Sequence, residues 1–463
     1  MSKLQVHAPY DGQLIKELDI TSEDQLEVMV NTAYDLYTNQ SQWIKLSERI
    51  TILEKTADIV EERAEQFAKE AAREGGKPLV DSRVELARAV QGIREAARSV
   101  GQLVGREIPM NLNAASANRF AVTRREPIGV VVAISAFNHP FNLIVHQVVP
   151  AFIVGCPVIV KPASSTPLSC INLLECLYEA GAPKEWIQMG ILSNKLSEKL
   201  VTDTRTSFLT FIGSGKVGWY LRSMLAPGAH CALEHGGAAP VILDETANID
   251  EALPLLAKGG FYHAGQVCVS VQRLFVHASK VKEVSRGLVK AAKSLVVGDP
   301  LDEKTEVGPL ILEREVDRIE EWVKEAKESG GKILVGGKRI GTTCFEPTVI
   351  LNPADDTSVS QKEIFGPVVC IYTYTSLEDA IKRANNVPFS FQASIFTEQI
   401  DTALSASQKL NASAVMINDH TAFRVDWMPF GGRKQSGMGV GGILPTMEEM
   451  TEEKLVVFKS KVL

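Results

Sequence analysis

Short runs of apolar and β-branched residues alternate with helical patterns from residue 127 onward, and this alternation constrains the fold most strongly. The runs "IGVVVAISAF" at 128–137 and "CPVIVKPA" at 156–163 both end in polar loops, with a helical pattern between them. A third unit, "TSFLTFIGSGKVGWYL" at 206–221, is typical of a strand, a turn and a helix. Continuous apolar strands that alternate with helices indicate parallel sheets covered by helices on both faces.

The same pattern starts again at Pro240, which predicts a second unit and a boundary near Gly236 and Gly237. A chain of 463 residues is also too long for one simple core. We therefore predict an α/β protein with two doubly wound, Rossmann-like parallel-sheet domains. The expected strands of the second domain are "PVILD", "QRLFVHA", "KILVGG", "FEPTVIL" and "VVCIYTY".

The first hundred residues are predicted to be mainly helical. Ser22 with Gln25 resembles a capping box at the start of one helix. Further helices are expected over 47–74, before the pair of glycines at 75–76, and over 81–104.

Composition narrows the classes of partner and compartment. The net charge is −7 and basic residues are scattered, so we expect neither nucleic acid nor an anionic membrane as a partner. The apolar runs are too short to span a bilayer, and "MSKLQVHAPYDG" lacks the core of a signal peptide. The seven cysteines form no CxxC pair or Cys/His cluster, which favours a reducing, cytoplasmic compartment and no metal site.

The segment "GSGKVG" at 213–218 matches the GxGxxG pattern between a predicted strand and a predicted helix. Glycines there allow a close approach of the backbone to a pyrophosphate, which the helix N-terminus attracts. The pattern also expects an acid about 20 residues later, and Glu234 stands 21 residues after Gly213. On this pattern alone Glu234 would bind a ribose.

Cys268, in "FYHAGQVCVS", suggests another use for Glu234, which lies 34 positions upstream. A thiolate can attack an electrophile, and a nearby carboxylate can activate the thiol or a water molecule. Taken alone, one cysteine among seven is more often a buried packing residue.

Eight segments in order along nearly the whole chain resemble the aldehyde dehydrogenase family. They are "EPIGVVVAISAFNHPFN", "GCPVIVKPASSTPL", "FLTFIGSGKVG", "ALEHGGAAP", "AGQVCVS", "GDPLDEKTEVGPLI", "KEIFGPVV" and "MPFGGRKQSGMG". Within the family, the sequence most resembles members that act on lactaldehyde, phosphonoacetaldehyde or succinic semialdehyde.

The resemblance implies that Cys268 attacks the aldehyde to form a thiohemiacetal. The amide of Asn138 and the backbone N–H of Cys268 would hold the oxyanion, and Glu234 would activate water to hydrolyse the later thioester. On local grounds Asn138 could instead cap the following helix. A base at Glu234 argues against the branches of the family that transfer the acyl group to coenzyme A. The set of three also argues against a catalytically idle binding protein of the same fold.

The cofactor implied by the resemblance is NAD or NADP. The residues expected to bind it are Lys161, Ser164, Gly213, Ser214, Val217, Glu363 and Phe365. Lys161 would reach the adenosine ribose, and Glu363 would hold the nicotinamide ribose beside Phe365. The alternatives are a solvated lysine, an exposed acid and a core aromatic.

Ser164 departs from the family pattern, because NAD-preferring members usually carry Glu three residues after the lysine. Serine removes a carboxylate that would repel a 2′-phosphate, and Lys161 could pair with that phosphate. We therefore expect use of NADP or of both cofactors.

Arg424, His139 and His146 are the residues expected to contact the substrate. Arg424 stands where members acting on apolar aldehydes often carry an aromatic residue, and arginine suits a carboxylate, phosphate or sulfonate. The alternatives are that the histidines bond to backbone, and that Arg424 pairs with Asp426 or bridges subunits. A small, polar and anionic aldehyde is predicted, with a neutral hydroxyaldehyde such as lactaldehyde as the second candidate.

The resemblance also implies the domain layout. Residues 1–108 and 128–236 would form the NAD(P)-binding domain, and 237–448 the catalytic domain. Residues 109–127 and 449–463 would form oligomerisation strands of a homodimer or homotetramer.

Overall fold

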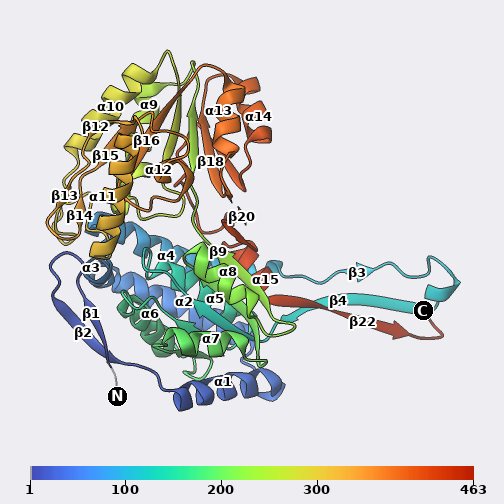
Figure 1. The fold of residues 1–463 in the computed structure, drawn as a ribbon. Coiled ribbons are helices and arrows are strands. Elements are labelled where there is room, and N and C mark those ends of the chain that lie inside the picture. The colour runs from blue at the N-terminus through green and yellow to red at the C-terminus, as the bar shows by residue number, and fades with distance from the viewer. Residues whose placement is uncertain (1–2) are drawn as a thin grey trace.

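The computed structural model describes residues 3–463, which form two sheet-centred units and a projecting arm (Figure 1). The predicted α/β class with two parallel-sheet units is confirmed. The helices are α1 (Glu23–Thr38), α2 (Leu46–Glu62), α3 (Ala64–Gly75), α4 (Leu79–Ser99), α5 (Asn142–Val154), α6 (Leu168–Glu179), α7 (Asn194–Thr202), α8 (Gly215–Ser223), α9 (Ile249–Phe261), α10 (Val281–Ser294), α11 (Glu313–Glu328), α12 (Ser358–Gln361), α13 (Leu377–Asn385), α14 (Ile400–Lys409) and α15 (Ile443–Glu449).

The first sheet has six strands in the order β21-β9-β8-β5-β6-β7. Their bounds are β5 (Val130–Ile134), β6 (Val158–Lys161), β7 (Ile187–Met189), β8 (Thr206–Ile212), β9 (His230–Glu234) and β21 (Gly437–Met438). All neighbours are parallel except β21, which pairs antiparallel with β9. The strand order reverses between β5 and β8, and ligands of open α/β sheets bind outside the carboxyl ends of strands at such a point.

Strand β5 shows why the sequence carries continuous apolar runs. Val131 and Ala133 pack into one core with the helices α4 and α5, whereas Val130 and Val132 pack into another core with α1. Successive side chains of a strand point to opposite faces, so a sheet covered on both faces needs apolar residues at every position.

The second sheet has seven strands in the order β12-β15-β16-β11-β10-β18-β19. Their bounds are β10 (Pro240–Leu243), β11 (Arg273–His277), β12 (Lys332–Val335), β15 (Thr348–Leu351), β16 (Val368–Tyr374), β18 (Gln392–Phe396) and β19 (Ala414–Ile417). Only β12 runs antiparallel to its neighbour, so the parallel sheet expected from Pro240 onward is confirmed. Smaller pairs are formed by β1 (Lys3–His7) with β2 (Leu14–Asp19), β13 (Arg339–Ile340) with β14 (Cys344–Phe345), and β17 (Phe389–Ser390) with β20 (Arg433–Lys434).

The N-terminal helices agree with the sequence prediction except at one point. Ser22 and Gln25 form the predicted capping box, and Gly76 ends α3 with φ of 73°. The single helix expected over 47–74 is wrong, because the backbone leaves helical geometry at Arg63 and divides it into α2 and α3. At this break the Arg63 guanidinium makes two hydrogen bonds of 2.8 Å to Glu179 of α6.

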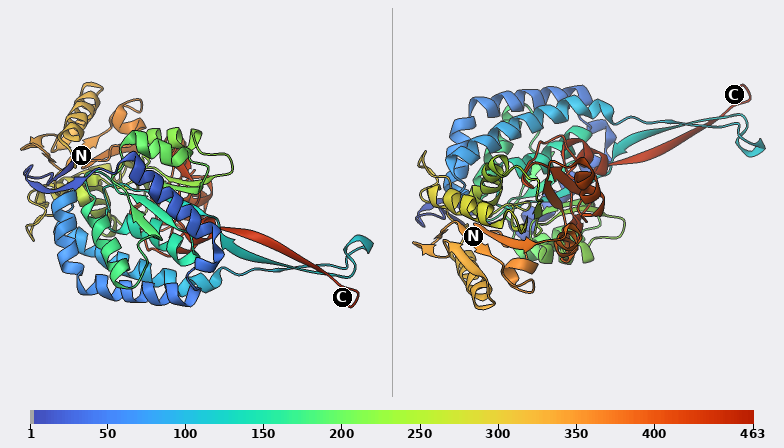
Figure 2. Two further views of the ribbon diagram at one scale, coloured as in Figure 1. Left: turned by 90° about the horizontal axis from the view of Figure 1, so that it is seen from below. Right: turned by 90° about the horizontal axis from the view of Figure 1, so that it is seen from above.

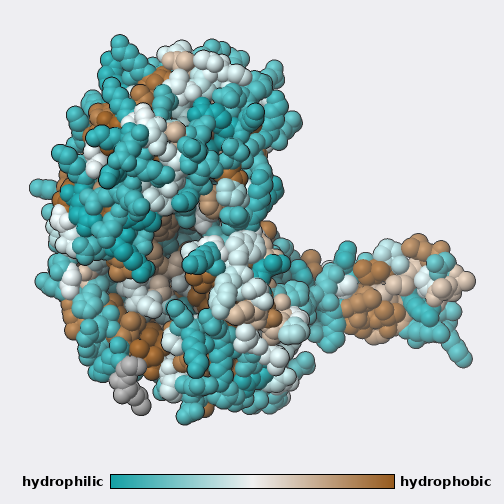
Figure 3. All heavy atoms as spheres, viewed as in Figure 1, coloured by the Kyte–Doolittle hydropathy of each residue, from teal (hydrophilic) through white to brown (hydrophobic). Residues whose placement is uncertain are grey.

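The arm consists of β4 (Arg119–Pro127), β22 (Thr451–Lys459) and the short β3 (Glu107–Ile108). Strands β4 and β22 pair antiparallel over their whole length, which brings segments from residues 109–127 and 449–463 into one sheet. The arm extends away from both sheet units in every view (Figures 1 and 2). Hydrophobic side chains gather on its surface (Figure 3), and the exposed ones include Phe120, Leu455, Val457 and Phe458.

No helix within residues 3–463 combines the length and the apolar character that crossing a membrane requires.

Candidate active site

A cavity of about 850 Å³ lies between the two sheet units and takes its walls from both. It contains nearly all of the residues that the sequence predicted for the site. These are Asn138, His139, His146, Lys161, Gly213, Ser214, Val217, Glu234, Cys268, Glu363, Phe365 and Arg424. Ser164 is exposed and is not among the lining residues, although Lys161 and Ala163 are. Within residues 3–463, no group of three or more His, Cys, Asp or Glu side chains is placed to hold a metal ion.

Cys268 lies in the loop between α9 and β11, after an unusual turn. His263, Ala264 and Gly265 all have positive φ, at 48°, 53° and 67°. Side chains rarely adopt this conformation, and such strain concentrates at functional sites. Burial raises the pKa of the Cys268 thiol to about 12, and the charge of Glu363 adds to this effect. The thiol is therefore protonated in the free protein.

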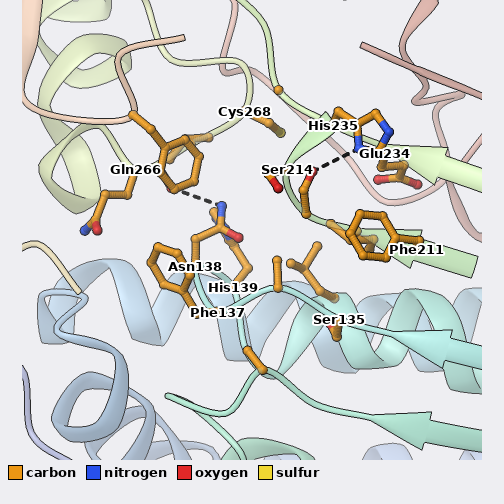
Figure 4. A pocket seen from close by; sticks show the side chains of 18 of the residues that line it. Ser135, Phe137, Asn138, His139, Phe211, Ser214, Glu234, His235, Gln266 and Cys268 are labelled. Atoms are coloured by element: carbon orange, nitrogen blue, oxygen red, sulfur yellow. Dashed lines mark hydrogen bonds between the residues drawn. The ribbon is translucent and has the colours of Figure 1, made fainter. Parts of the chain in front are cut away.

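Asn138 follows the carboxyl end of β5 and faces the loop that carries Cys268. Its Nδ2 donates a hydrogen bond of 3.0 Å to the carbonyl oxygen of Gln266 (Figure 4). The alternative role as a helix cap is wrong, because α5 begins at Asn142 and its first N–H groups are bound elsewhere. The backbone N–H groups of Phe141 and Asn142 both donate to Glu85 Oε1 at 2.9 Å. The Asn138 amide has two N–H donors, and the bond to Gln266 uses one of them.

Glu234 ends β9, which β8 separates from β5 in the same sheet, and it lines the cavity as Asn138 does (Figure 4). Its carboxylate lies so close to Gly441 that a Cβ there would come within 2.1 Å of Oε1. Burial raises the pKa of Glu234, and the positive charge of Arg424 opposes that rise. A carboxylate with a raised pKa is suited to accept a proton from water.

The turn from β8 to α8 forms the predicted glycine-rich segment. Ser214 occupies the N-cap position of α8, but its side chain makes no hydrogen bond to the N–H groups of the first turn. His235 supports the turn, because its Nδ1 bonds to the carbonyl oxygen of Gly213 at 2.9 Å. Gly218 packs against the same ring, and a Cβ there would come within 2.0 Å of it. The helix start, with its positive dipole end, fits a pyrophosphate.

Glu363 and Phe365 lie where the cavity reaches toward Cys268. Oε1 of Glu363 is buried and has no hydrogen-bond partner, and burial raises the pKa of this carboxyl to about 8. A buried acceptor without a donor fits the hydroxyl groups of a ribose. Phe365 has φ of 47° and packs edge-on against Phe137, with ring centroids 5.9 Å apart. Lys161, at the end of β6, is partly buried, and burial lowers its pKa. These residues fit a dinucleotide.

Replacing Glu363 by Gln is expected to accelerate alkylation of Cys268 by iodoacetamide several-fold at pH 8 in the absence of cofactor. The carboxylate raises the pKa of Cys268, so its removal lowers that pKa and increases the thiolate fraction at a given pH. The rate is measured by mass spectrometry of the Cys268 peptide. The control is Glu315→Gln, which removes another cavity carboxylate. Unchanged or slower alkylation of the Glu363 variant would contradict the expectation.

Arg424 lies over the ring of Phe430, with its guanidinium carbon 3.5 Å from the ring centroid. Its Nη2 donates to Nδ1 of His146 at 3.4 Å, and its buried Nε has no partner. The suggested pairing of Arg424 with Asp426 is wrong, because Asp426 accepts a two-point hydrogen bond from Arg88 instead. Among residues 3–463, no carboxylate comes within 4.0 Å of the Arg424 guanidinium.

His139 and His146 are both neutral at physiological pH. Burial and the charge of Arg424 lower the pKa of His146 to about 4, although its Nε2 lies 2.7 Å from Asp426 Oδ1. Burial lowers the pKa of His139 well below its ordinary value, and its ring packs edge-on against Tyr262. The alternative of a histidine bonded to backbone does not apply to His146, whose partners are side chains.

Sequence reasoning missed Arg88 and Tyr262 as parts of this wall. Arg88 belongs to a helix rich in Arg and Ala, where it resembles a solvated residue. Gly92, one turn further along α4, packs against Val145 of α5, which shows that this helix faces inward here. The sequence did carry a signal that this part of α4 faces the interior. Three residues close to Arg88 are apolar and buried, namely Leu86, Ala89 and Val90.

Comparisons with known proteins identify the family of the chain. Residues 1–456 match the model of the aldehyde dehydrogenase family. The chain is 37% identical over 456 residues to a 3-sulfolactaldehyde dehydrogenase of Priestia megaterium, covering 98% of this chain and 94% of the relative. It is 36% identical over 455 residues to a lactaldehyde dehydrogenase of Methanocaldococcus jannaschii, covering 97% and 96%.

Two solved structures are similar over almost the whole chain. One is aldehyde dehydrogenase 21 of Physcomitrella patens in complex with the reaction product succinate, with a TM-score of 0.95, 35% identity and coverage of 99% and 95%. The other is the glyceraldehyde-3-phosphate dehydrogenase GapN of Methanocaldococcus jannaschii complexed with NADP, with a TM-score of 0.93, 34% identity and coverage of 99% of each chain. The chain therefore belongs to the aldehyde dehydrogenase family of NAD(P)-dependent oxidoreductases that act on aldehydes.

Proposed function

We propose that this chain oxidises a small aldehyde with a remote anionic group to the carboxylic acid, through a covalent adduct on Cys268. The observation that carries the anionic substrate is Arg424, a cavity guanidinium with no carboxylate partner and an unpaired buried Nε. Burying a charge without a counter-charge is unfavourable, so a bound anion at this position stabilises the site.

Cys268 is the proposed nucleophile. The thiol first loses its proton to solvent water. The thiolate sulfur then bonds to the aldehyde carbon, and the carbonyl oxygen becomes an oxyanion within reach of the Asn138 amide and the Cys268 backbone N–H. Fixed donors of this kind lower a barrier by about 3–4 kcal/mol. A bound nicotinamide supplies the acceptor for the two electrons and the hydrogen that leave the adduct carbon, which then becomes a thioester.

Glu234 is the proposed base for the second half of the reaction. It accepts a proton from water, the hydroxide attacks the thioester carbon, and the Cys268 thiolate leaves with the bonding electrons. The products are the carboxylic acid and the restored cysteine. The raised pKa of Glu234 supports this role, since a base is most effective when its pKa approaches the working pH.

The proposed cofactor contacts are Lys161 and Ser164 with the adenosine ribose, Gly213, Ser214 and Val217 with the pyrophosphate region, and Glu363 and Phe365 with the nicotinamide half. We favour NADP or dual use, because Ser164 brings no carboxylate to repel a 2′-phosphate. The similar GapN structure holds NADP. Ser164 is not among the residues that line the cavity. Its proposed contribution is therefore the absence of a carboxylate that would repel a 2′-phosphate.

His139 and His146 are proposed to line the substrate end beside Arg424. Carboxylate and sulfonate substrates are supported by the succinate bound to the Physcomitrella enzyme and by the sulfolactaldehyde relative. Oxidation of the neutral lactaldehyde is the second candidate, which the Methanocaldococcus relative supports. The test is kcat/KM with NAD and NADP for sulfolactaldehyde, succinic semialdehyde, phosphonoacetaldehyde, glyceraldehyde 3-phosphate and lactaldehyde.

Replacing Arg424 by Met is expected to lower kcat/KM for succinic semialdehyde about 30-fold or more, chiefly through KM, because close charge pairs contribute several kcal/mol. The effect on butanal, which has the same carbon chain without the carboxylate, is expected to be much smaller. Steady-state kinetics with the two aldehydes give the comparison. Equal losses for both would contradict the anionic substrate and leave lactaldehyde-type chemistry as the better explanation.

We also propose the domain layout given by the sequence, with 1–108 and 128–236 binding cofactor, 237–448 carrying the nucleophile, and 109–127 with 449–463 joining subunits. The exposed apolar side chains of the arm support a homodimer or homotetramer. The seven free cysteines support a reducing, cytoplasmic location.

A further inference from the structure

Four polar side chains are linked by hydrogen bonds at the end of the cavity proposed for the substrate, and they comprise two arginines but only one carboxylate. Arg88 on α4 bonds to Asp426 through Nε at 3.2 Å and through Nη2 at 2.7 Å. Asp426 is bonded in turn to His146 Nε2 at 2.7 Å, and His146 Nδ1 accepts from Arg424 at 3.4 Å.

Asp426 is a buried and fully committed anion. It is 1% exposed, and it also accepts a hydrogen bond of 3.2 Å from Asn142 Nδ2. Burial alone would raise its pKa, but the hydrogen bonds from His146 and Arg88 and the charge of Arg88 outweigh burial and hold the pKa far below its usual range. Asp426 therefore stays ionised and cancels the charge of Arg88.

His146 orients the Arg424 side chain but carries no charge at pH 7. Because its pKa is lowered to about 4, it is neutral at pH 7. A neutral imidazole carries one proton, and the bond to the ionised Asp426 places that proton on Nε2. The lone pair of Nδ1 then faces the Arg424 guanidinium, which orients Arg424 without neutralising it.

We propose that Asp426 determines which anions the pocket accepts: by neutralising Arg88, it leaves the single charge of Arg424 for the substrate and selects a monoanionic carboxylate or sulfonate over a dianionic phosphate. This inference rests on the proposed function, because it assumes that Arg424 binds the remote group of the substrate. Two free guanidinium groups would suit a phosphate, whereas one suits a group with a single charge. Glu234 attracts Arg424 from beyond ion-pair distance and is unchanged in every variant below, so it does not affect their comparison.

The test uses three aldehydes with one carbon frame and different groups on C3. They are 3-sulfolactaldehyde with a monoanionic sulfonate, glyceraldehyde 3-phosphate with a phosphate that is mostly dianionic at pH 8, and neutral glyceraldehyde. For the unsubstituted protein we expect kcat/KM for the sulfonate to exceed that for the phosphate by roughly tenfold or more, at the low end of what close charge pairs contribute.

Two single variants are expected to shift selectivity in opposite directions. Asp426→Asn frees the charge of Arg88, so the sulfonate-to-phosphate ratio of kcat/KM should fall by about tenfold. Arg88→Met leaves the charge of Asp426 unbalanced near Arg424, so both anions should lose about tenfold relative to glyceraldehyde. The double variant carries neither charge and should return both ratios to within about threefold of the unsubstituted protein.

The matched controls break an ion pair between α4 and α2, formed by Arg94 and Asp58 at 3.0 Å, which lies outside the cavity. Arg94→Met and Asp58→Asn should leave both ratios unchanged. A purely structural role of the Arg88–Asp426 pair would lower kcat/KM for all three aldehydes alike, with no recovery in the double variant, and this result would overturn the proposal.

The unsubstituted protein also provides a test that does not depend on whether the variants fold. If it uses both anions equally well and prefers them to glyceraldehyde, the selection by Asp426 is refuted while the anionic substrate stands. If it does not prefer either anion to glyceraldehyde, the anionic substrate itself is refuted. The two failures are therefore distinguishable in the same assay.

Discussion

Replacing Cys268 by Ala is expected to lower kcat for aldehyde-dependent reduction of NAD(P) by at least about 10⁴-fold, the scale seen when a covalent nucleophile is removed. The reason is that neither Asn138 nor Glu234 can replace the thiol in the covalent bond that holds the acyl group on the protein. The loss is measured from the formation of NAD(P)H under saturating aldehyde. Binding of the cofactor, followed by fluorescence titration, should persist, because the proposed cofactor residues are intact.

The matched control is Cys231→Ala. Cys231 is also partly buried and lies on β9, the strand that ends in Glu234, but it is not among the residues that line the cavity. This variant should retain most of the activity. Substantial turnover by the Cys268 variant would exclude the covalent mechanism.

Replacing Glu234 by Gln is expected to separate the two halves of the reaction. Cys268 should still be acylated, so rapid mixing should show a burst of about one NAD(P)H per subunit, since covalent accumulation gives burst kinetics. Steady-state turnover should then fall by about 10²–10⁴-fold, the usual contribution of a general base. Mass spectrometry of the quenched reaction should find the acyl group on the peptide that contains Cys268.

The pH dependence of the same variant gives an independent readout. Burial raises the pKa of Glu234, and only the ionised carboxylate can accept a proton from water. In the unsubstituted protein the steady-state rate should therefore rise as pH increases through that raised pKa, and the Gln variant should lack this rise. Glu245→Gln, at an exposed position after β10, serves as the control. A Glu234 variant without a burst, or one rescued only by coenzyme A, would contradict hydrolysis by Glu234.

The features that were predictable from the sequence are those encoded locally. The strand-turn-helix unit around Gly213 is visible as a run of apolar residues followed by glycines, and the capping box at Ser22 lies within four residues. Cys268 and Glu234 belong to short motifs whose sequences resemble those of the family. The cavity contains both of them, although their roles stay predictions until the variants are measured.

The features that were not predictable depend on contacts between distant parts of the chain. The break at Arg63 coincides with an ion pair to Glu179, which lies 116 residues later. The exclusion of Asn138 from capping follows from Glu85, which occupies the N-terminus of α5 from another helix. Neither partner could be identified from periodicity, because periodicity reports only which face of an element is apolar.

The sequence by itself determined that this protein has two helix-covered parallel sheets and a family motif with a thiol, an amide and a carboxylate. Both depend on patterns within a few residues, which hydrophobic burial and backbone geometry translate directly into local structure. The tertiary structure alone decided that Asp426 pairs with Arg88, 338 positions away, and not with Arg424 two positions away. The free energy of a buried ion pair depends on which charges the packed helices and loops bring together, and the order of residues along the chain does not specify that.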